Sequence, residues 1–477
     1  MKINLIRVVE FNENKSFHPR DVIPSFELLN IASLLKKEGH KIKLFDNEVL
    51  SLNSHKFEKL INKNDADIYV FHFQPIAANA LFKIIKKLKT KSKKITIAFG
   101  PTVEYQTEEF LKKSFADYAI LGEVELTILK LINTIFKKYF LSVKEKENID
   151  GLAFLNKNKF IKNKLRPLLD PNSLPFLAHE LIQNQKYKVV SKIIQPKKKI
   201  KWGFLLSSRG CPFNCAFCAP SIRNSIGKKY RYQTPKRTVD EMEYMIKKYK
   251  VTAISIEDDI FTLNRQRVLS ICEEIIKRQI NISWTVATRL DCLDLKLLTL
   301  MKKAGCQGVS TGVESGSDRI LKLINKGEKT KDIIKGIELL NKVDIATTIN
   351  LIVGHPTETL KDLKLTVNIV KKIRPVFIHL HYFTPYPGTQ IFEEYQKKLN
   401  YFKKYSHRQL HKFNISSLDT KTLQKMVKKI YFSHYINISF LKTYLKYRKN
   451  YWIYDPLFEI KFLINTFSYF FLLNRDD

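Results

Sequence analysis

The sequence predicts an α/β protein with two domains and a helical C-terminal region, and three observations support this fold class. Its 477 residues are more than one ordinary hydrophobic core accommodates. Short apolar segments alternate with stretches of helical periodicity, as in proteins with parallel sheets. Prolines at positions 167, 171 and 175 separate two such alternating series. We expect a doubly wound, Rossmann-like sheet in residues 1–143, a hairpin and linker in 144–200, a partial (β/α)6 barrel of the TIM type in 201–395, and helices in 396–477.

The first domain is predicted to alternate strands with helices. The strands cover residues 3–9, 41–46, 68–73, 95–99 and a segment that starts at Tyr118. Ligands of such sheets bind beside the carboxyl ends of the strands. Gly100 and Gly122 follow two of these ends, where a residue without a side chain lets a large ligand approach. Neither a glycine-rich dinucleotide loop nor a P-loop motif occurs in this part of the sequence.

Residues 144–200 are predicted to join the two domains. Two short apolar runs flank Asn156-Lys-Asn158, which is the pattern of a β-hairpin. The segment 191–201 is rich in lysine, and we expect it to be exposed. The domain boundary should therefore lie in this region.

The second domain is predicted to contain six strand–helix units, which is too few to close a barrel. Thr238-x-x-Glu241 has the form of a capping box that opens a helix. Each strand ends in polar residues or glycine, at the edge where barrel enzymes place their active sites. The predicted strands are residues 202–207, 253–256, 283–287, 308–312, 347–353 and 376–382.

The charge of the chain is strongly positive, with a formal net charge of +37. Such an excess is compatible with binding to nucleic acid or to an anionic membrane. However, the lysines are spread over predicted helical surfaces, which favours a solvated surface over a nucleic-acid groove. Nucleic acid is therefore the less favoured partner.

The six cysteines do not form a disulfide framework, because three are clustered and three are scattered. This distribution predicts a reducing, cytoplasmic location. The chain does not open with a secretory segment, and the apolar run 462–473 is too short to span a bilayer.

Three of the cysteines stand in one short loop, Cys211-Pro-Phe-Asn-Cys215-Ala-Phe-Cys218, directly after the first barrel strand. A structural zinc site closes with four ligands, and an iron–sulfur cubane held by cysteine also needs four. Three thiolates on a cubane leave one iron open to a substrate. A zinc knuckle or unrelated surface cysteines is the alternative interpretation.

The cysteine triplet and the strand ends that follow it resemble radical S-adenosylmethionine (SAM) enzymes, with six landmarks in order over nearly 190 residues. In that family the open iron chelates the amino acid end of SAM. The resemblance implies that Cys211, Cys215 and Cys218 bind a 4Fe-4S cluster. It also implies contacts with SAM. The adenine would be contacted by Phe217, Gly354 and Pro356, and the methionine amino group by Glu257 and Asp258. The carboxylate would be contacted by Arg289, and the ribose or amino acid end by Glu314.

Several of these residues also have a purely structural interpretation. The acidic run from Glu257 to Asp259 replaces the Gly-Gly-Glu usual in the family and could simply cap a helix. Arg289 could pair with Asp291 or Asp294, and the Pro-Tyr-Pro-Gly-Thr segment 385–389 could only shape a turn. The remaining cysteines, Cys272, Cys292 and Cys306, are expected to be structural.

The first domain resembles the cobalamin-binding domain that precedes many radical SAM domains. The matching pieces are Pro24 with the helix after it, Gly39-His40, the segment from Phe99 to Thr102, and Leu121 to Glu125. The resemblance implies that cobalamin contacts Gly100, Pro101, Thr102, Gly122 and Glu123. An Asp-x-His-x-x-Gly motif is missing, which implies cobalamin without a lower histidine ligand. His72 could approach the cobalt or make only loop hydrogen bonds, and the fold could also persist without its cofactor.

The C-terminal region is rich in aromatic residues on a basic background, which suggests helices. An ordinary helical cover of the barrel is the simplest interpretation. The region could instead cap the open side of the barrel, contribute to the substrate pocket, or lie on a lipid surface as an amphipathic segment in a peripheral membrane contact.

The resemblance implies a cytoplasmic radical SAM enzyme that uses a 4Fe-4S cluster and SAM, with cobalamin, to form a 5′-deoxyadenosyl radical and modify an unactivated carbon. A methyltransferase or cyclase is the expected class. The substrate, a small molecule, lipid or peptide, is not identified, and neither are residues that act on it. The electron donor would be a flavodoxin or ferredoxin.

Two other classes of function remain open. One is a cobalamin-free radical SAM enzyme, for example a tRNA-modifying one. The tRNA methylthiotransferases, however, carry further cysteines in their first domain, and here no cysteine precedes Cys211. The other is a non-catalytic basic protein that binds nucleic acid or membranes.

Overall fold

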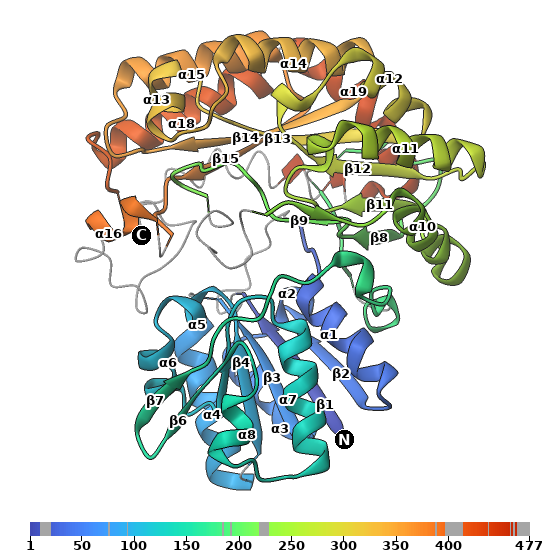
Figure 1. Cartoon of the computed structure of the whole chain (residues 1–477). Coiled ribbons are helices and arrows are strands. Elements are labelled where there is room, and N and C mark those ends of the chain that lie inside the picture. Colours follow the sequence, from blue (N-terminus) through green and yellow to red (C-terminus); the bar gives the residue numbers. More distant parts are fainter. Residues whose placement is uncertain are drawn as a thin grey trace.

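The computed structural model describes residues 1–9, 21–74, 77–92, 94–183, 186–190, 193–218, 229–386, 389–395, 414–436, 438–457, 459–460 and 463–464. The chain forms two α/β domains, with the N-terminal domain drawn below the second domain in Figure 1. Each domain contains a parallel sheet covered by helices, which confirms the predicted fold class.

The N-terminal sheet has seven strands in the order β2-β1-β3-β4-β5-β6-β7. Its first five strands are parallel, and their carboxyl ends lie at the edge nearest the second domain (Figure 1). All six residues of β3 are buried, as expected for a strand covered on both faces. The five strands are β1 (Lys2–Val8), β2 (Lys41–Asp46), β3 (Ile68–Phe73), β4 (Ile95–Phe99) and β5 (Tyr118–Ile120).

Helices cover both faces of this sheet and form two separate hydrophobic cores. One core contains Phe57, Ile84 and Phe110, and the other contains Leu28 and Ile128. The helices of this domain are α1 (Phe26–Lys37), α2 (Asn47–Leu50), α3 (Ser54–Lys63), α4 (Ala78–Ser92), α5 (Pro101–Tyr105), α6 (Thr107–Ser114), α7 (Glu125–Lys137) and α8 (Val143–Glu147).

The predicted hairpin is present as β6 (Leu152–Asn156) and β7 (Lys159–Lys162). Instead of standing in a linker between the domains, it extends the first sheet, because β6 pairs antiparallel with β5. Lys157 and Asn158 have positive φ angles, which is the backbone conformation of the tight hairpin turns.

The second domain contains a six-stranded parallel sheet in the order β15-β14-β13-β12-β11-β8. Strands β8 and β15 do not pair with each other, so the barrel is partial, as the six units predict. A two-stranded ribbon, β9 (Ser208–Arg209) with β10 (Arg231–Tyr232), follows β8. The barrel strands are β8 (Trp202–Leu205), β11 (Ala253–Ile256), β12 (Ser283–Ala287), β13 (Cys306–Glu314), β14 (Ala346–Val353) and β15 (Phe377–Tyr382).

Helices cover the outer face of this sheet and share one large core with it. Helix α10 begins at Pro235 with Thr234 as its N-cap, so the predicted capping box at Thr238 and Glu241 is wrong. Proline at the first helical position fixes that start. The helices are α10 (Pro235–Tyr249), α11 (Arg265–Lys277), α12 (Leu295–Lys303), α13 (Asp318–Leu323), α14 (Thr330–Lys342), α15 (Leu360–Ile373) and, after β15, α16 (Gln390–Tyr395).

Two C-terminal helices, α18 (Thr420–Tyr435) and α19 (Ile438–Tyr454), pack on the barrel. Leu423 and Val427 of α18 belong to the barrel core, which confirms a helical cover. Tyr447 of α19 packs with Ala346 and Val376, at the amino ends of β14 and β15. This position lies opposite the strand ends where the predicted site residues stand. Most of the apolar run 462–473 lies outside the described residues, and no helix in the described ranges is long and apolar enough to cross a membrane.

Buried ion pairs hold the two domains together. Arg209 lies 3.2 Å from Glu123 and 2.6 Å from Glu125, and Arg231 lies 2.8 Å from Glu123. Burial alone would lower the pKa of Arg209, but Glu125 and Glu123 raise it overall, so the guanidinium stays charged. Because Glu123 follows β5 and Arg209 follows β8, the carboxyl ends of the two sheets face each other.

Arg209→Gln should lower the free energy of unfolding by about 3–5 kcal/mol, since it leaves Glu125 buried without its cation. Urea unfolding followed by circular dichroism measures this loss. The control is Lys236→Gln, which breaks an exposed pair with Asp240 and should cost less than about 1 kcal/mol. Equal losses for the two variants would contradict a stabilising role of the interdomain pairs.

Candidate active site

The cysteine loop follows the first barrel strand and is fixed by the segment after α13. The Ala216 N–H donates to the carbonyl of Ile324 at 2.9 Å, and the side-chain amide of Asn325 donates to the carbonyl of Asn214 at 2.9 Å. None of the three cysteines forms a disulfide; Cys215 is buried and the other two are half-buried. The predicted cluster ligands therefore stand together at the carboxyl end of the barrel.

The donor set suits a cubane better than a single ion. Across the described ranges, no three His, Cys, Asp or Glu side chains are arranged to hold one metal ion. In a cubane each cysteine binds a different iron, so the thiolates stand farther apart than ligands that share one ion. Three thiols in one loop therefore fit a cluster that keeps one iron open, because a cubane held by cysteine alone takes four ligands.

Asp258 anchors the strand that leads into the cysteine loop. Its carboxylate accepts hydrogen bonds from the backbone N–H groups of Ser207 and Ser208 at 2.6 and 2.9 Å, and from both hydroxyls at 2.6 and 2.7 Å. Buried Arg267 donates to the Ser207 hydroxyl and lies 3.8 Å from Asp258. Asp258 is thus occupied by the protein, and binding a methionine amino group would require breaking these bonds. Its neighbour Glu257, which accepts from Ser255, is half-buried.

Arg289 pairs with Asp291, at 2.9 and 2.6 Å, as its structural interpretation anticipates. Asp294 instead caps α12 and pairs with Arg265. The guanidinium of Arg289 also lies 3.8 Å from the centre of the Phe213 ring, inside the cysteine loop. Arg289 therefore supports this loop, and a SAM carboxylate would have to share it with Asp291.

A buried lysine that sequence reasoning missed lies next to the predicted Glu314. The ammonium of Lys326 lies 3.5 Å from Glu314 and 3.4 Å from Glu328. Burial alone would lower the pKa of Lys326, but these two carboxylates raise it overall. Burial raises the pKa of the Cys215 thiol, and Lys326 and Arg289 act in the opposite direction, towards the thiolate that binds metal. Lys326 belongs to no sequence motif, so only the fold could reveal it.

Glu314 itself has a left-handed backbone, with φ at 61°, at the end of β13. This conformation is rare for residues other than glycine and is concentrated at functional sites. Burial raises the pKa of its carboxyl group. On the same strand, the buried hydroxyl of Thr311 has no hydrogen-bond partner within the described structure. This end of β13 therefore presents polar atoms that suit a polar ligand.

The loop after β15 reaches the cysteines through Tyr386. Burial raises the pKa of Tyr386 to about 12, and the nearby Cys218 thiol contributes to this rise. The Thr389 hydroxyl donates to the carbonyl of Tyr386 at 2.6 Å and closes a turn. Residues 387 and 388 of the Pro-Tyr-Pro-Gly-Thr segment lie outside the described residues. The first and last strand loops of the barrel thus approach each other at Cys218.

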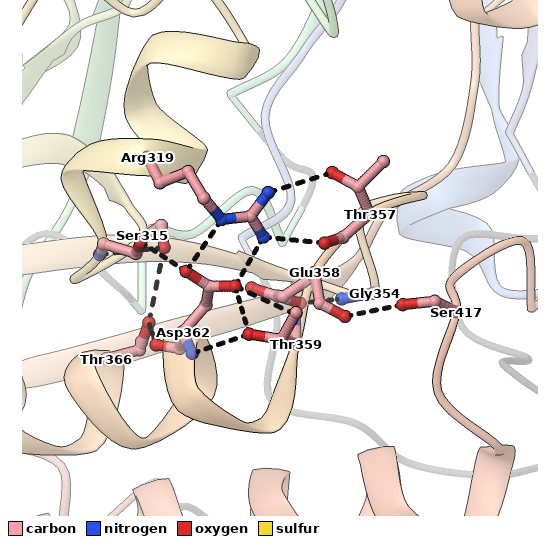
Figure 2. Close-up of polar contacts among 10 residues, drawn as sticks. Ser315, Arg319, Gly354, Thr357, Glu358, Thr359, Asp362, Thr366 and Ser417 are labelled. Atoms are coloured by element: carbon pink, nitrogen blue, oxygen red, sulfur yellow. Dashed lines mark hydrogen bonds and ion pairs between the residues drawn. The ribbon is translucent and has the colours of Figure 1, made fainter.

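The predicted adenine turn, Gly354-His355-Pro356, is supported by a hydrogen bond between Gly354 and Glu358 (Figure 2). The Gly354 N–H donates to the Glu358 carboxylate at 2.6 Å, and the Ser417 hydroxyl donates to the carbonyl of Glu358 at 2.9 Å. Burial raises the pKa of Glu358 from 4.5 to about 7, and burial lowers the pKa of His355 to about 4. Burial therefore disfavours the charged form of both ionisable groups at this turn.

A second network beside Glu358 involves a charged carboxylate (Figure 2). Arg319 binds Asp362 at 2.5 Å, and the hydroxyls of Ser317 and Thr359 each donate to Asp362 at 2.6 Å. Burial opposes ionisation, but these hydrogen bonds lower the pKa of Asp362 overall. The network joins the start of α13 to the start of α15 and so fixes the loops after β13 and β14.

At the N-terminal strand ends, the glycines have different reasons to be glycine. A Cβ atom at Gly100 would lie 2.5 Å from the carbonyl oxygen of Phe73, so Gly100 is required by packing against β3, whatever ligand is bound. Gly122 has φ at 74°, and its N–H donates to Glu104 at 3.0 Å. His72 stacks on Phe99 with ring centres 4.7 Å apart.

Thr102 and Glu123 are both predicted to contact cobalamin, but only Thr102 has a polar atom that is still without a hydrogen bond in the described structure. The buried hydroxyl of Thr102 has no hydrogen-bond partner within the described structure, whereas both oxygens of Glu123 are taken by Arg209, Arg231 and Leu169. Pro101 begins helix α5. The unpartnered Thr102 hydroxyl is the kind of group that a bound cofactor would satisfy, because buried polar groups are normally hydrogen-bonded.

The three cysteines outside the loop are separate from this site. Cys272 and Cys306 are fully buried in the barrel core, and burial raises the pKa of Cys272 to about 12. Cys292 is half-buried and contacts Asp291.

Comparison with known proteins agrees with this arrangement. The model of the radical SAM superfamily matches residues 205–370. An uncharacterized methyltransferase of Pyrococcus horikoshii is 29% identical over 78% of each chain, and the anaerobic magnesium-protoporphyrin IX monomethyl ester cyclase of Rubrivivax gelatinosus is 28% identical over 65% of this chain and 54% of the cyclase. The apo structure of the cobalamin-dependent SAM radical enzyme OxsB superposes with a TM-score of 0.69, covering 99% of this chain and 71% of OxsB at 16% identity.

The second domain is therefore a radical SAM domain. The family match is confined to residues 205–370, and the overall fold of the chain is similar to that of the cobalamin-dependent SAM radical enzyme OxsB.

Asp258→Asn should lower the free energy of unfolding by about 3–5 kcal/mol, because it leaves Arg267 buried beside an uncharged side chain. The amount of iron incorporated on reconstitution should also fall, because the strand that leads into the cysteine loop loses its anchor. The control Asp259→Asn changes the exposed neighbouring carboxylate and should do neither. Urea unfolding and an iron assay measure the two effects. Full iron incorporation and unchanged stability in Asp258→Asn would contradict the anchoring role.

Glu358→Gln should change how stability depends on pH. Because the folded protein binds the Glu358 proton more tightly than the unfolded chain, wild-type stability is lost as pH rises from about 4.5 to about 7. Glutamine does not ionise. The free energy of unfolding of the variant, relative to that of wild type, should therefore rise by about 2–3 kcal/mol between pH 5 and pH 8. Thermal or urea unfolding at the two pH values measures this.

The control is Asp362→Asn, for which the sign is opposite. The folded-state pKa of Asp362 is lowered, so its contribution is present at neutral pH and is lost only in acid. This variant should therefore be less stable than wild type at pH 8. A flat difference between wild type and Glu358→Gln across pH would refute the buried, proton-binding state of Glu358.

Proposed function

We propose that this protein is a cobalamin-dependent radical SAM methyltransferase or cyclase. The observation that carries the proposal is the position of the three cysteines, none of them in a disulfide, in the loop after the first barrel strand. This loop begins two residues beyond Arg209, which binds the N-terminal sheet. A cofactor at the cysteines and a ligand at the strand ends of the N-terminal domain would therefore share the interdomain region. Such a juxtaposition is what a two-cofactor reaction needs.

Under this proposal, Cys211, Cys215 and Cys218 hold the 4Fe-4S cluster. Around it, Glu257, Arg289, Glu314 and the turn of Gly354 and Pro356 are the groups that we propose to contact SAM. Lys326 is added to this set because it is buried and cationic beside Glu314, where a carboxylate would be attracted. In the N-terminal domain, Thr102 and Gly122 are the groups proposed to contact cobalamin.

When bound, the reduced cluster supplies the electron that cleaves SAM to a 5′-deoxyadenosyl radical. The protein binds and orients the cofactors and shields the reacting carbon from water. Glu358 holds the turn of Gly354 in place, and Asp258 holds the strand that delivers the cysteines. Lys326 and Arg289 favour thiolates at the cysteine loop. These residues position the reactants and exchange no proton with the substrate in this scheme.

The similar proteins suggest the reaction class and a first substrate to test. One relative is named a methyltransferase and another is a cyclase of magnesium-protoporphyrin IX monomethyl ester. We infer that the reaction is either methyl transfer to an unactivated carbon or ring formation. A tetrapyrrole ester is the first substrate class to assay, and a cytoplasmic flavodoxin or ferredoxin is the proposed electron donor.

Cys215→Ala should lower dithionite-driven formation of 5′-deoxyadenosine to background, because the cluster would lose a ligand. Cys292→Ala serves as the matched control, since this half-buried cysteine lies outside the loop, and it should retain activity. Product is measured by liquid chromatography after anaerobic reconstitution. SAM cleavage by Cys215→Ala at the wild-type rate would refute the radical mechanism.

The cobalamin part of the proposal is tested separately on the same preparation. Wild-type protein incubated with hydroxocobalamin should retain corrinoid after gel filtration, visible in its absorption spectrum. SAM cleavage without any corrinoid retention would instead assign the protein to the cobalamin-free radical SAM enzymes.

A further inference from the structure

The C-terminal part of the chain exposes an unusual amount of apolar surface. Among the described residues, ten large apolar side chains between 432 and 464 are exposed, while the other exposed ones are spread over the part of the chain before residue 432. Contiguous exposed apolar surface marks an interaction site in soluble proteins. The ten are Phe432, Ile436, Leu441, Leu445, Trp452, Ile453, Tyr454, Leu457, Ile460 and Ile464.

Helix α19 has one covered face and, within the described structure, an exposed apolar stripe beside it. Tyr444, Tyr447 and Tyr451 are buried, and Tyr447 donates to Asp344 of the barrel at 2.7 Å. On the adjoining side of the helix, Leu441 and Leu445 are each about half exposed, at 54% and 51%. Side chains four apart lie on the same side of a helix, so these leucines form one exposed stripe that borders the covered face.

Basic residues flank this leucine stripe. Lys442, Lys446 and Lys449 are exposed, at spacings that place them on one adjoining side of α19. Nearby acidic charge is neutralised in part, because Glu459 is buried in a pair with Arg448 at 2.6 Å. Lys446 also pairs with Asp344 at 2.6 Å. The stripe therefore combines apolar side chains with net positive charge, in a chain whose formal charge is +37.

The end of α19 and the sequence after it continue the same character. Trp452, Ile453 and Leu457 follow the stripe, and no charged residue occurs from 462 to 474. Tryptophan and tyrosine favour the boundary between lipid and water, where one end of the side chain is apolar and the other is hydrated.

We propose that the exposed face of α19, together with the exposed side chains of Trp452, Ile453, Leu457, Ile460 and Ile464, binds the surface of a bilayer that contains anionic lipids. The apolar side chains enter the headgroup region, and the lysines contact the lipid phosphates. Because α19 covers the amino ends of β14 and β15, this contact leaves the cysteine loop and the N-terminal domain on the far side of the barrel, accessible to cofactors and to a reductant.

Vesicle flotation of the full-length protein tests this surface. Protein should float with vesicles containing phosphatidylglycerol, and at least tenfold less protein should float with pure phosphatidylcholine. The double variant Leu441→Glu with Leu445→Glu should lose flotation. Charge reversal at Lys442 and Lys449 should weaken binding about fivefold per charge and reduce its sensitivity to salt.

The matched control is Leu295→Glu with Leu365→Glu, which adds the same charges at exposed leucines on α12 and α15. This control should float like wild type, and iron incorporation reports correct folding of every variant. Flotation independent of lipid charge, or unaffected by the α19 substitutions, would overturn the proposal. The proposal would also be overturned if the wild-type protein were a dimer and the α19 substitutions made it a monomer, as measured by size-exclusion chromatography with light scattering. That result would assign the surface to a second copy of the chain.

Deleting residues 465–477 separates the two apolar segments. The proposal expects the shortened protein to float with anionic vesicles and still respond to the leucine substitutions. Complete loss of flotation on deletion, with no effect of the α19 substitutions, would assign lipid binding to the deleted segment and overturn the role of α19.

Discussion

The ion pairs of Arg209 with Glu123 and Glu125 are the constraint on which the geometry of the candidate site depends. Arg209 stands two residues before Cys211, so the same short segment joins the domains and carries the first cysteine. On its other side, Asp258 binds both N–H groups and both hydroxyls of Ser207 and Ser208. Residues 207–209 are therefore held by carboxylates from both domains, and the position of the cysteine loop is set by buried electrostatics more than by apolar packing.

Buried charge is costly unless it is paired, and this protein concentrates such pairs around the cysteines. Lys326, Glu314, Glu328 and Arg289 lie within one cluster next to Cys215. A hydrophobic set of similar volume would serve stability as well or better. Burial disfavours the thiolate form of Cys215, whereas the cations Lys326 and Arg289 favour it. Keeping both cations at this place makes physical sense if the thiolate has to bind metal. We therefore propose that this cluster serves cofactor binding more than stability.

The sequence was informative where a local pattern determines the outcome. Alternating strands and helices predicted both sheets, and the spacing of Cys211, Cys215 and Cys218 predicted one loop, because neither depends on distant partners. The hairpin was also recognised, but its pairing with β5 was not, since strand pairing is a tertiary contact. Proline at 235 likewise started α10 earlier than the capping box suggested, because it pre-sets the backbone of the first turn.

Residues that act through partners distant in sequence could not be assigned in the same way. Asp258 looked like a ligand in an acidic run, yet its partners are about 50 positions earlier, and Glu123 meets arginines 86 and 108 positions later. Lys326 carried no signal, since a lysine in a lysine-rich chain is ordinarily solvated. The strand-end position of such residues was readable from sequence, but which of them serve the protein and which remain for a ligand was not.

Gly100 shows why even a correctly placed residue can have another reason for its identity. Its position after β4 suggested room for a large ligand, but a side chain there would collide with the Phe73 carbonyl at 2.5 Å and with His72 at 2.9 Å. The glycine is needed so that β3 and β4 can end side by side, with His72 stacked on Phe99. Close packing of the strand ends brings the Thr102 hydroxyl, still without a partner in the described structure, to the carboxyl edge of the sheet. The room at this edge is therefore secondary to the packing that creates it, and the group that a ligand would recognise is two residues beyond the glycine.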